Sequence, residues 1–286
     1  MGAYNFRLLK DELSLPAWLA IGAAAQIIVS FAAPARFAYV PAVVTIAVLT
    51  LNFAAQLFGL TQNIYLKNTV PGRHTVIFPN DDGTRPENFG DKPIAMFLVG
   101  IRSNSPLGRL SPAYRKLNDY MDELYADAEG NRTTNGYLGR TADFLPQDFS
   151  SNNTLLSISY WKTIEDLEAF ARRPIHIKAF RYLVKIQTTG NDQQGTGVLH
   201  EILYCPPGHW EAIYSNMNPW GLQRLQWPMP KSRALQGPFV EHNMKIINGM
   251  WGRMGNKLKQ TESDEKMAQA EKAAAAYLTG APTTAV

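Results

Sequence analysis

The sequence has little cysteine and little net charge. Its single cysteine, Cys205, has no partner for a disulfide within the chain, which fits a domain on the cytosolic side of a membrane. The 28 basic and 24 acidic residues leave a formal net charge of only +4, and the basic residues are scattered among acids. Nucleic acid is therefore not an expected partner.

Three kinds of site motif are missing from the sequence. It has no glycine-rich phosphate loop, no cluster of cysteine and histidine at zinc spacing, and no Gly-x-Ser-x-Gly nucleophile elbow. These absences argue against a phosphate-loop enzyme, a zinc module and an α/β-hydrolase. We expect no metal ion.

Two long stretches near the amino terminus lack charge. Residues 13–35 and 37–66 are separated by Arg36 alone, and each exceeds the roughly 20 apolar residues that cross a bilayer. Pro34 and Pro41 lie where one helix would stop and the next begin. We therefore predict a transmembrane hairpin over residues 1–66; the alternative is a pair of helices buried in a soluble core.

The charges that flank the hairpin indicate its orientation. Two spans put both ends on one side, and Arg7 and Lys10 precede the first span while Lys67 and Arg73 follow the second. Basic residues favour the cytoplasmic face, although Arg36 opposes this. We expect a membrane protein with two spans in the endoplasmic reticulum, its soluble domain facing the cytosol.

The remaining chain predicts a linker, one α+β domain and a tail. Residues 67–93 are rich in turn-forming residues and read as a linker, while residues 226–286 read as a C-terminal extension and tail. Between them, residues 94–225 alternate strand and helix patterns. We expect strands at 94–101, 136–144, 155–161, 198–205 and 210–217, with helices at 111–130 and from Thr163 and Pro174. This order is ferredoxin-like, and the last two strands could pair as a hairpin.

Two runs of residues carry a family resemblance. The first holds Ser159, Tyr160, Trp161, Glu165, Asp166, Leu167, Phe170 and His176; the second holds His200, Glu201, Pro207, Gly208, Glu211, Ile213, Tyr214, Asn216, Met217, Pro219, Gly221 and Leu222. Over residues 90–225 the chain resembles the fungal, fumagillin-pathway type of monooxygenase-like protein in the antibiotic-biosynthesis-monooxygenase superfamily. The resemblance implies a homodimeric α+β barrel, with a pocket between sheet and helices in each subunit.

The resemblance also bears on cofactors. Superfamily members include oxygenases that use neither metal nor flavin and others that bind or degrade haem. In the pattern of the haem branch the iron ligand would fall at Phe180, while His176 lies one helical turn earlier. The expectation is therefore no cofactor, since the ligand position does not support haem.

Eight side chains are candidates for the site. His176 lies on the apolar face of its helix, where a neutral imidazole can act as a base, and Glu201 and Glu211 alternate with apolar residues on their strands. These three are the predicted catalytic residues; the alternatives are a core or interface histidine and glutamates paired with arginine. The predicted substrate-binding residues are Tyr160, Trp161, Phe180, Tyr214 and Asn216.

These features together favour a membrane-anchored, monooxygenase-like oxidoreductase that acts on a hydrophobic small molecule in secondary metabolism. An anchored domain would meet such substrates where they concentrate, in the bilayer. Three alternatives remain open: a dehydratase or isomerase that uses acid and base groups in the same pocket, a haem-binding variant, and a tethered partner of a pathway enzyme that does no chemistry.

Overall fold

A computed structural model describes most of the chain. The described residues are 15–86, 89–146, 153–189, 194–229, 234–241 and 250–279. Arg7 and Lys10, on which the predicted orientation partly depends, lie outside them. The chain divides into two compact units, Met1–Thr69 with Leu107–Leu110, and Val70–Pro106 with Ser111–Val286.

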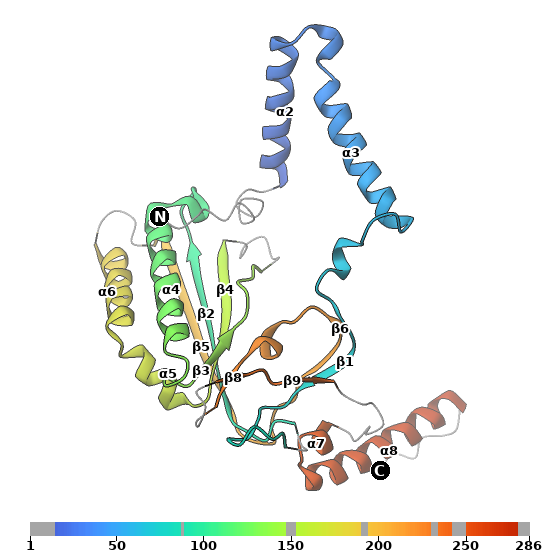
Figure 1. The fold of residues 1–286 in the computed structure, drawn as a ribbon, viewed down its shortest axis with the longest axis vertical. Helices are drawn as coiled ribbons and strands as arrows, with labels where there is room; N and C mark the ends of the chain where they lie inside the picture. Colours follow the sequence, from blue (N-terminus) through green and yellow to red (C-terminus); the bar gives the residue numbers. More distant parts are fainter. Residues whose placement is uncertain are drawn as a thin grey trace. The chain divides into compact units, whose positions relative to one another are not determined.

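The first unit is a helical hairpin (Figure 1). Helix α2 covers Leu15–Ala32 and helix α3 covers Val40–Leu57, with the short 3-10 helices η1 (Ala35–Phe37) between them and η2 (Ile64–Leu66) after them. Pro34 caps η1 and Pro41 lies in the first turn of α3, as predicted. By length and composition, Leu15–Ala32 and Ala35–Leu57 can each cross a membrane. They are almost entirely unburied, unlike the core helices of most soluble domains.

The second unit contains a ferredoxin-like sheet with its helices. In chain order its elements are β2 (Ile94–Ser103), α4 (Pro112–Gly130), β3 (Tyr137–Arg140), β4 (Thr154–Trp161), α5 (Ile164–Ala171), α6 (Pro174–Thr188) and β5 (Thr196–Cys205). The short 3-10 helix η3 (Gly108–Leu110), between β2 and α4 in sequence, belongs to the first unit. The four strands lie in the order β3-β4-β2-β5, and every neighbouring pair is antiparallel. This strand order with two crossover helices is the ferredoxin-like arrangement, which confirms the predicted fold.

Local capping explains why the helices begin where they do. The Ser111 hydroxyl accepts a hydrogen bond from the backbone N–H of Tyr114 at 3.4 Å, at the start of α4. The Thr163 hydroxyl accepts one from Asp166 N–H at 3.1 Å, at the start of α5. Both side chains satisfy amides that the first helical turn leaves unpaired. Pro174 starts α6, because proline suits a first helical turn.

Helices α4 and α6 lie side by side over one face of this sheet (Figure 1). The odd-numbered residues of β2, from Ala95 to Ile101, point to this face because side chains alternate along a strand. Ala95 and Trp161 pack there against residues of all three helices. The helices and the sheet thus enclose a layer of apolar side chains that includes the candidate site.

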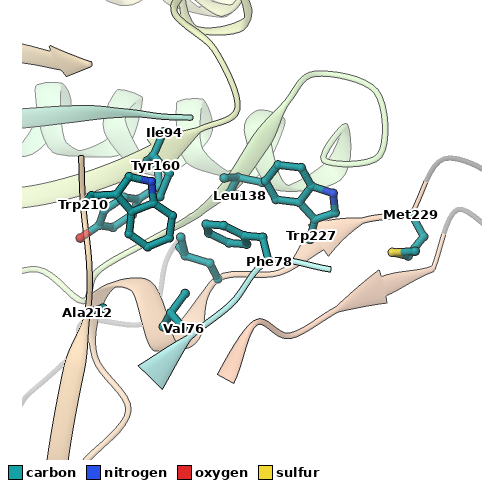
Figure 2. Packing of buried hydrophobic residues seen from close by; sticks show 10 residues of the cluster. Val76, Phe78, Ile94, Leu138, Tyr160, Trp210, Ala212, Trp227 and Met229 are labelled. Atoms are coloured by element: carbon teal, nitrogen blue, oxygen red, sulfur yellow. The ribbon is translucent and has the colours of Figure 1, made fainter. Parts of the chain in front are cut away.

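The other face of the sheet packs against a second sheet, of which the sequence predicted one strand, at residues 210–217. Strands β1 (Val70–Val76), β6 (Ile213–Met217) and β9 (Phe239–Glu241) form a three-stranded sheet in the order β6-β1-β9. Figure 2 shows Phe78 between Trp210 and Trp227 in the core on this side. The ring centroids lie 5.6 Å and 4.8 Å apart in these two pairs.

Three expectations from the sequence need correction here. The expected linker, residues 67–93, contains β1, and Val76 and Phe78 within it are fully buried, so this segment belongs to the folded unit. The last two predicted strands do not pair with each other, because β5 pairs with β2 and β6 pairs with β1. The expected boundary at residue 225 divides a core in which Leu225 and Trp227 pack together.

The C-terminal part continues from this core. It holds η4 (Gly221–Arg224), the short strands β7 (Trp227–Pro228) and β8 (Leu235–Gln236), and helices α7 (Met250–Arg253) and α8 (Lys257–Thr279). Arg253 binds Glu211 through two hydrogen bonds, of 2.6 Å and 2.8 Å. This ion pair ties α7 to the segment before β6.

Candidate active site

A cavity of about 440 Å³ lies between the sheet and helices α4 and α6. Its volume falls in the range of small-molecule sites. The sheet contributes the floor: Phe97, Val99, Ile101, Ser159, Val198 and His200. The helices contribute the remaining wall: Leu117, Met121, Leu124 and Tyr125 from α4, Phe170 from α5, and His176, Ala179, Phe180, Leu183 and Gln187 from α6. The helical members recur at spacings of three and four residues, which places them on one face of each helix.

His176 lies in the first turn of α6 and lines the cavity. Its ring stands edge-on to Phe170, with 6.0 Å between the ring centroids. Burial lowers the pKa of this histidine, and the nearby His200 lowers it further. Among the described residues His176 has no hydrogen-bond partner, so its neutral imidazole is available to a molecule in the cavity.

His200 lines the same cavity from strand β5. It is the cross-strand neighbour of Val99 and lies 5.7 Å from the Phe97 ring, measured between centroids. His200 is not among the predicted site residues, because the prediction places Glu201, its neighbour on the opposite face, on the inner side of this strand. The structure therefore brings together two imidazoles of which the sequence identified one.

The two predicted catalytic glutamates lie away from the cavity. Glu201 is paired with Leu98 in the sheet register, so its exposed side chain is on the face opposite the helices. Glu211 forms the ion pair with Arg253 described above. This agrees with the alternative interpretation of the sequence, in which the glutamate is paired with an arginine. We remove both glutamates from the set of candidate catalytic residues.

Of the predicted substrate-binding aromatics, Phe180 alone lines the cavity. Trp161 is fully buried beside it, and its indole N–H donates to the Ser159 hydroxyl at 3.1 Å. Tyr160 and Tyr214 belong to the core on the other face of the sheet. Burial raises the pKa of Tyr160 to about 12, so this phenol remains protonated.

Asn216 has a structural role in the second sheet. Its backbone has a φ of 52°, in the left-handed region, which asparagine tolerates better than most residues. Its side-chain oxygen accepts a hydrogen bond from the backbone N–H of Gly72 at 2.9 Å, across the irregular start of the β1–β6 pairing. It does not line the cavity, so the predicted role in polarising a carbonyl does not fit.

Several polar cavity residues were missed besides His200. Tyr125 and Ser159 line the cavity, and Ser157 lies behind Tyr125 with a 3.0 Å hydrogen bond between the two hydroxyls. A signal for Tyr125 was present in the sequence. Tyr125 lies four residues after Met121, so the helical spacing that identifies α4 places both residues on the same face of the helix.

Comparison with known proteins gives matches over the same part of the chain. Residues 94–222 match the family described as Monooxygenase af470-like. Monooxygenase af470 of Aspergillus fumigatus is 26% identical over 211 residues, which are 74% of this chain and 74% of that protein. The matched range agrees with residues 90–225, over which the sequence resembles a fungal monooxygenase-like family, so this prediction is confirmed.

Two of the matches to solved structures each cover less than half of the chain. SnoaB, a cofactor-independent oxygenase from Streptomyces nogalater, is 12% identical with a TM-score of 0.27, over 38% of this chain and 90% of that chain. A dimeric ferredoxin-like protein of unknown function from Jannaschia sp. CCS1 is 18% identical with a TM-score of 0.28, over 38% of this chain and 97% of that chain.

Proposed function

Because residues 94–222 match the Monooxygenase af470-like family, we propose that this protein is a monooxygenase of a hydrophobic small molecule and that the cavity beside His176 is its active site. The observation that supports the proposal is the cavity itself. Its walls are mostly apolar, and two imidazoles are the ionisable groups best placed for proton transfer. Sites of this kind bind apolar molecules and orient them with a few polar groups.

The proposed reaction begins with proton removal. Neutral His176 takes a proton from a carbon that is acidified by a neighbouring phenol or carbonyl group. The resulting carbanion gives electrons to dioxygen and forms a carbon–oxygen bond, which yields a peroxide. Loss of water from the peroxide converts the original CH₂ group into a carbonyl. The four electrons that reduce dioxygen come from the substrate, with one oxygen atom in the product and one in water.

This route needs no cofactor, since the substrate is the reductant and dioxygen the oxidant. The sequence pattern of the haem branch does not support haem binding here, because Phe180 stands at the expected position of the iron ligand and has no donor atom. His176 remains in the cavity wall as a base. No step of the proposed reaction involves iron.

The hairpin suggests where the protein works. We propose that α2 and α3 cross the membrane of the endoplasmic reticulum and hold the folded domain on its cytosolic side. Hydrophobic substrates concentrate in a bilayer, so an anchored enzyme meets them at high local concentration. The proposed role in secondary metabolism rests instead on the resemblance to the fumagillin-pathway type of monooxygenase-like protein.

We also propose a homodimer. Leu199 and Leu203 on β5 are 40% and 54% exposed, and the register with Gly100 and Met96 places them on the sheet face away from the helices. An apolar sheet face that is open to water is stabilised when a second copy covers it.

Metabolite profiling tests the enzymatic proposal while the substrate is still unidentified. Deletion of the gene should cause a precursor with one oxygen atom fewer and two hydrogen atoms more than the normal product to accumulate. Wild-type protein should restore the product, and so should His209→Ala, which removes an exposed histidine outside the cavity. His176→Ala should not. Restoration by His176→Ala would overturn the assignment of the base.

The identity of the accumulated precursor separates the alternatives. An isomer of the product, or a compound that differs from it by one water, would replace the monooxygenase with an acid–base isomerase or dehydratase. Undiminished turnover without oxygen would lead to the same conclusion. An unchanged metabolite profile together with loss of a partner enzyme from the membrane would favour the tethered partner.

A further inference from the structure

The polar groups of the cavity wall include two pairs on opposite sides of the central strand β2, here called its two ends. His200 lies on β5 with His176 near it, and Ser159 lies on β4 with Tyr125 near it; a further polar residue, Gln187, donates its side-chain N–H to the Thr196 carbonyl. Between them the floor is apolar, with Phe97, Val99 and Ile101 on the central strand β2. This arrangement restricts the shape and chemistry of the molecule that fits the cavity.

The sheet register gives the separation of the two ends. Val99 pairs with Ser157 on one side and with His200 on the other, so these three residues form a row across β4, β2 and β5. Neighbouring strands lie about 4.8 Å apart, which places the backbones of Ser157 and His200 roughly 10 Å apart. A ligand that contacts both polar ends must therefore be longer than a single aromatic ring.

The Tyr125 end is built to offer a neutral hydrogen bond. The hydroxyls of Ser157 and Ser159 interact with the Tyr125 hydroxyl and hold it in place. Burial raises the pKa of Tyr125, so the phenol stays protonated and can donate. A phenol hydroxyl is both donor and acceptor and can bind one more oxygen.

The histidine end differs in chemistry. Imidazole changes charge near neutral pH and can take a proton from an acidic hydroxyl or carbon. Phe170 and Phe97 stand next to the two histidine rings and keep this end otherwise apolar. One end therefore suits the acidic, reacting part of a ligand, and the other suits a distant oxygen that orients it.

We infer that the cavity takes an elongated, largely apolar molecule with an oxygen function at each end, one held by His176 and His200 and the other by Tyr125 with Ser159. The substrate class is thus an apolar compound longer than a single aromatic ring, with an acidic hydroxyl or C–H group at one terminus and a carbonyl or hydroxyl at the opposite terminus. This inference rests on the proposed function, because it places the substrate in the same site.

Two matched probes test the inference by binding alone. One is biphenyl with a hydroxyl at the far end of one ring, and the other carries a hydroxyl at the far end of both rings. Their dissociation constants are measured by calorimetry with the full chain in lipid nanodiscs, without oxygen. Because partition into lipid is the same for every variant, the comparison uses the ratio of the two constants in each variant.

Tyr125→Phe removes one hydroxyl and keeps the ring. We expect it to weaken binding of the doubly hydroxylated probe about fivefold, the effect of one hydrogen bond, and to change the singly hydroxylated probe less than about twofold. Ser157→Ala, which removes a group that holds the Tyr125 hydroxyl, should give a smaller change of the same kind. Tyr182→Phe is the control, because this hydroxyl donates to the Ala113 carbonyl and Tyr182 does not line the cavity.

Three results would overturn the inference: failure of both probes to bind, an equal loss for both probes in Tyr125→Phe, or no loss for either. These results are independent of the monooxygenase proposal, because the assay contains no dioxygen and measures no turnover. A protein with the expected ratios but without oxygenase activity would keep the two-ended ligand and lose the proposed reaction.

Discussion

Narrowing the cavity from α6 should stabilise the domain and weaken its function. Ala179 is buried on α6, lines the cavity and faces the sheet. Ala179→Leu adds three carbon atoms that the space of about 440 Å³ can accept. Each buried carbon contributes about 0.8 kcal/mol, so the gain in the free energy of unfolding reaches at most about 2 kcal/mol. Leucine and alanine differ little in helix propensity, so the backbone adds only a small cost.

The assay combines thermal unfolding with binding. A gain of this size corresponds to a rise in Tm on the order of 5 °C for a domain of this length. In the same variant we expect weaker binding of the biphenyl probes and less product in the complemented strain. Ala169→Leu makes the same substitution at an exposed position of α5 and should change neither binding nor activity.

Two results would refute this reasoning. If Ala179→Leu destabilises the domain by more than about 1 kcal/mol, the added atoms overpack the site and the space is not open in the native protein. If the variant is stable and keeps full activity, the reaction takes place elsewhere. The second result would remove the catalytic interpretation of His176 as well.

The remaining predictions concern proton transfer, an ion pair and a close backbone approach. Burial lowers the pKa of His176, and this base is active when it is neutral. In a pH profile of kcat/KM, activity should therefore persist below about pH 6.5, the ordinary pKa of histidine. It should decline only as the pH falls through the lowered pKa. A profile that rises toward acid would contradict this. Glu211→Gln should lower the free energy of unfolding by about 2 kcal/mol, because its partner Arg253 is mostly buried, and should leave activity unchanged. Gly90→Ala should cost more than about 2 kcal/mol in chemical denaturation, because its φ is +63° and an added Cβ would lie 2.2 Å from the Trp210 carbonyl oxygen. A stable Gly90→Ala protein would show that this loop shifts easily.

Local signals account for the parts of the fold that could be predicted from the sequence. The caps at Ser111 and Thr163 and the proline at position 174 fix helix starts through bonds within a few residues of each other. The apolar run of β2 identifies a strand covered on both faces. Once these elements are in order along the chain, few topologies remain, and the ferredoxin-like one is the simplest.

Strand β1 could not be predicted in the same way. Its sequence from Val70 to Val76 contains a proline, a glycine and further polar residues, which give little β propensity. The strand forms because it pairs with β6 and β9, which lie far along the chain at Ile213–Met217 and Phe239–Glu241. Pairing over such a separation leaves no trace in a local pattern, so the segment resembles a linker.

The inner face of β5 could not be identified for a different physical reason. Val198 and Ile202 are apolar on one face, and Leu199 and Leu203 are apolar on the other, so alternation cannot tell which side points inward. If the wrong face of β5 is taken as the inner one, Glu201 is predicted in the cavity in place of His200. The register with β2 decides the matter, since Val99 faces the helices and His200 is its neighbour.

The open cavity distinguishes a binding domain from a purely structural one. A core that served stability alone would be filled, because space without partner atoms forfeits dispersion contacts and costs free energy in proportion to its volume. Here the small Ala179 of α6 lines the cavity together with larger apolar side chains such as Phe97 and Phe180. A small residue among large ones leaves room for an apolar ligand. A tethered partner that performs no chemistry would gain no stability from such a space, so the packing favours a domain that binds a ligand.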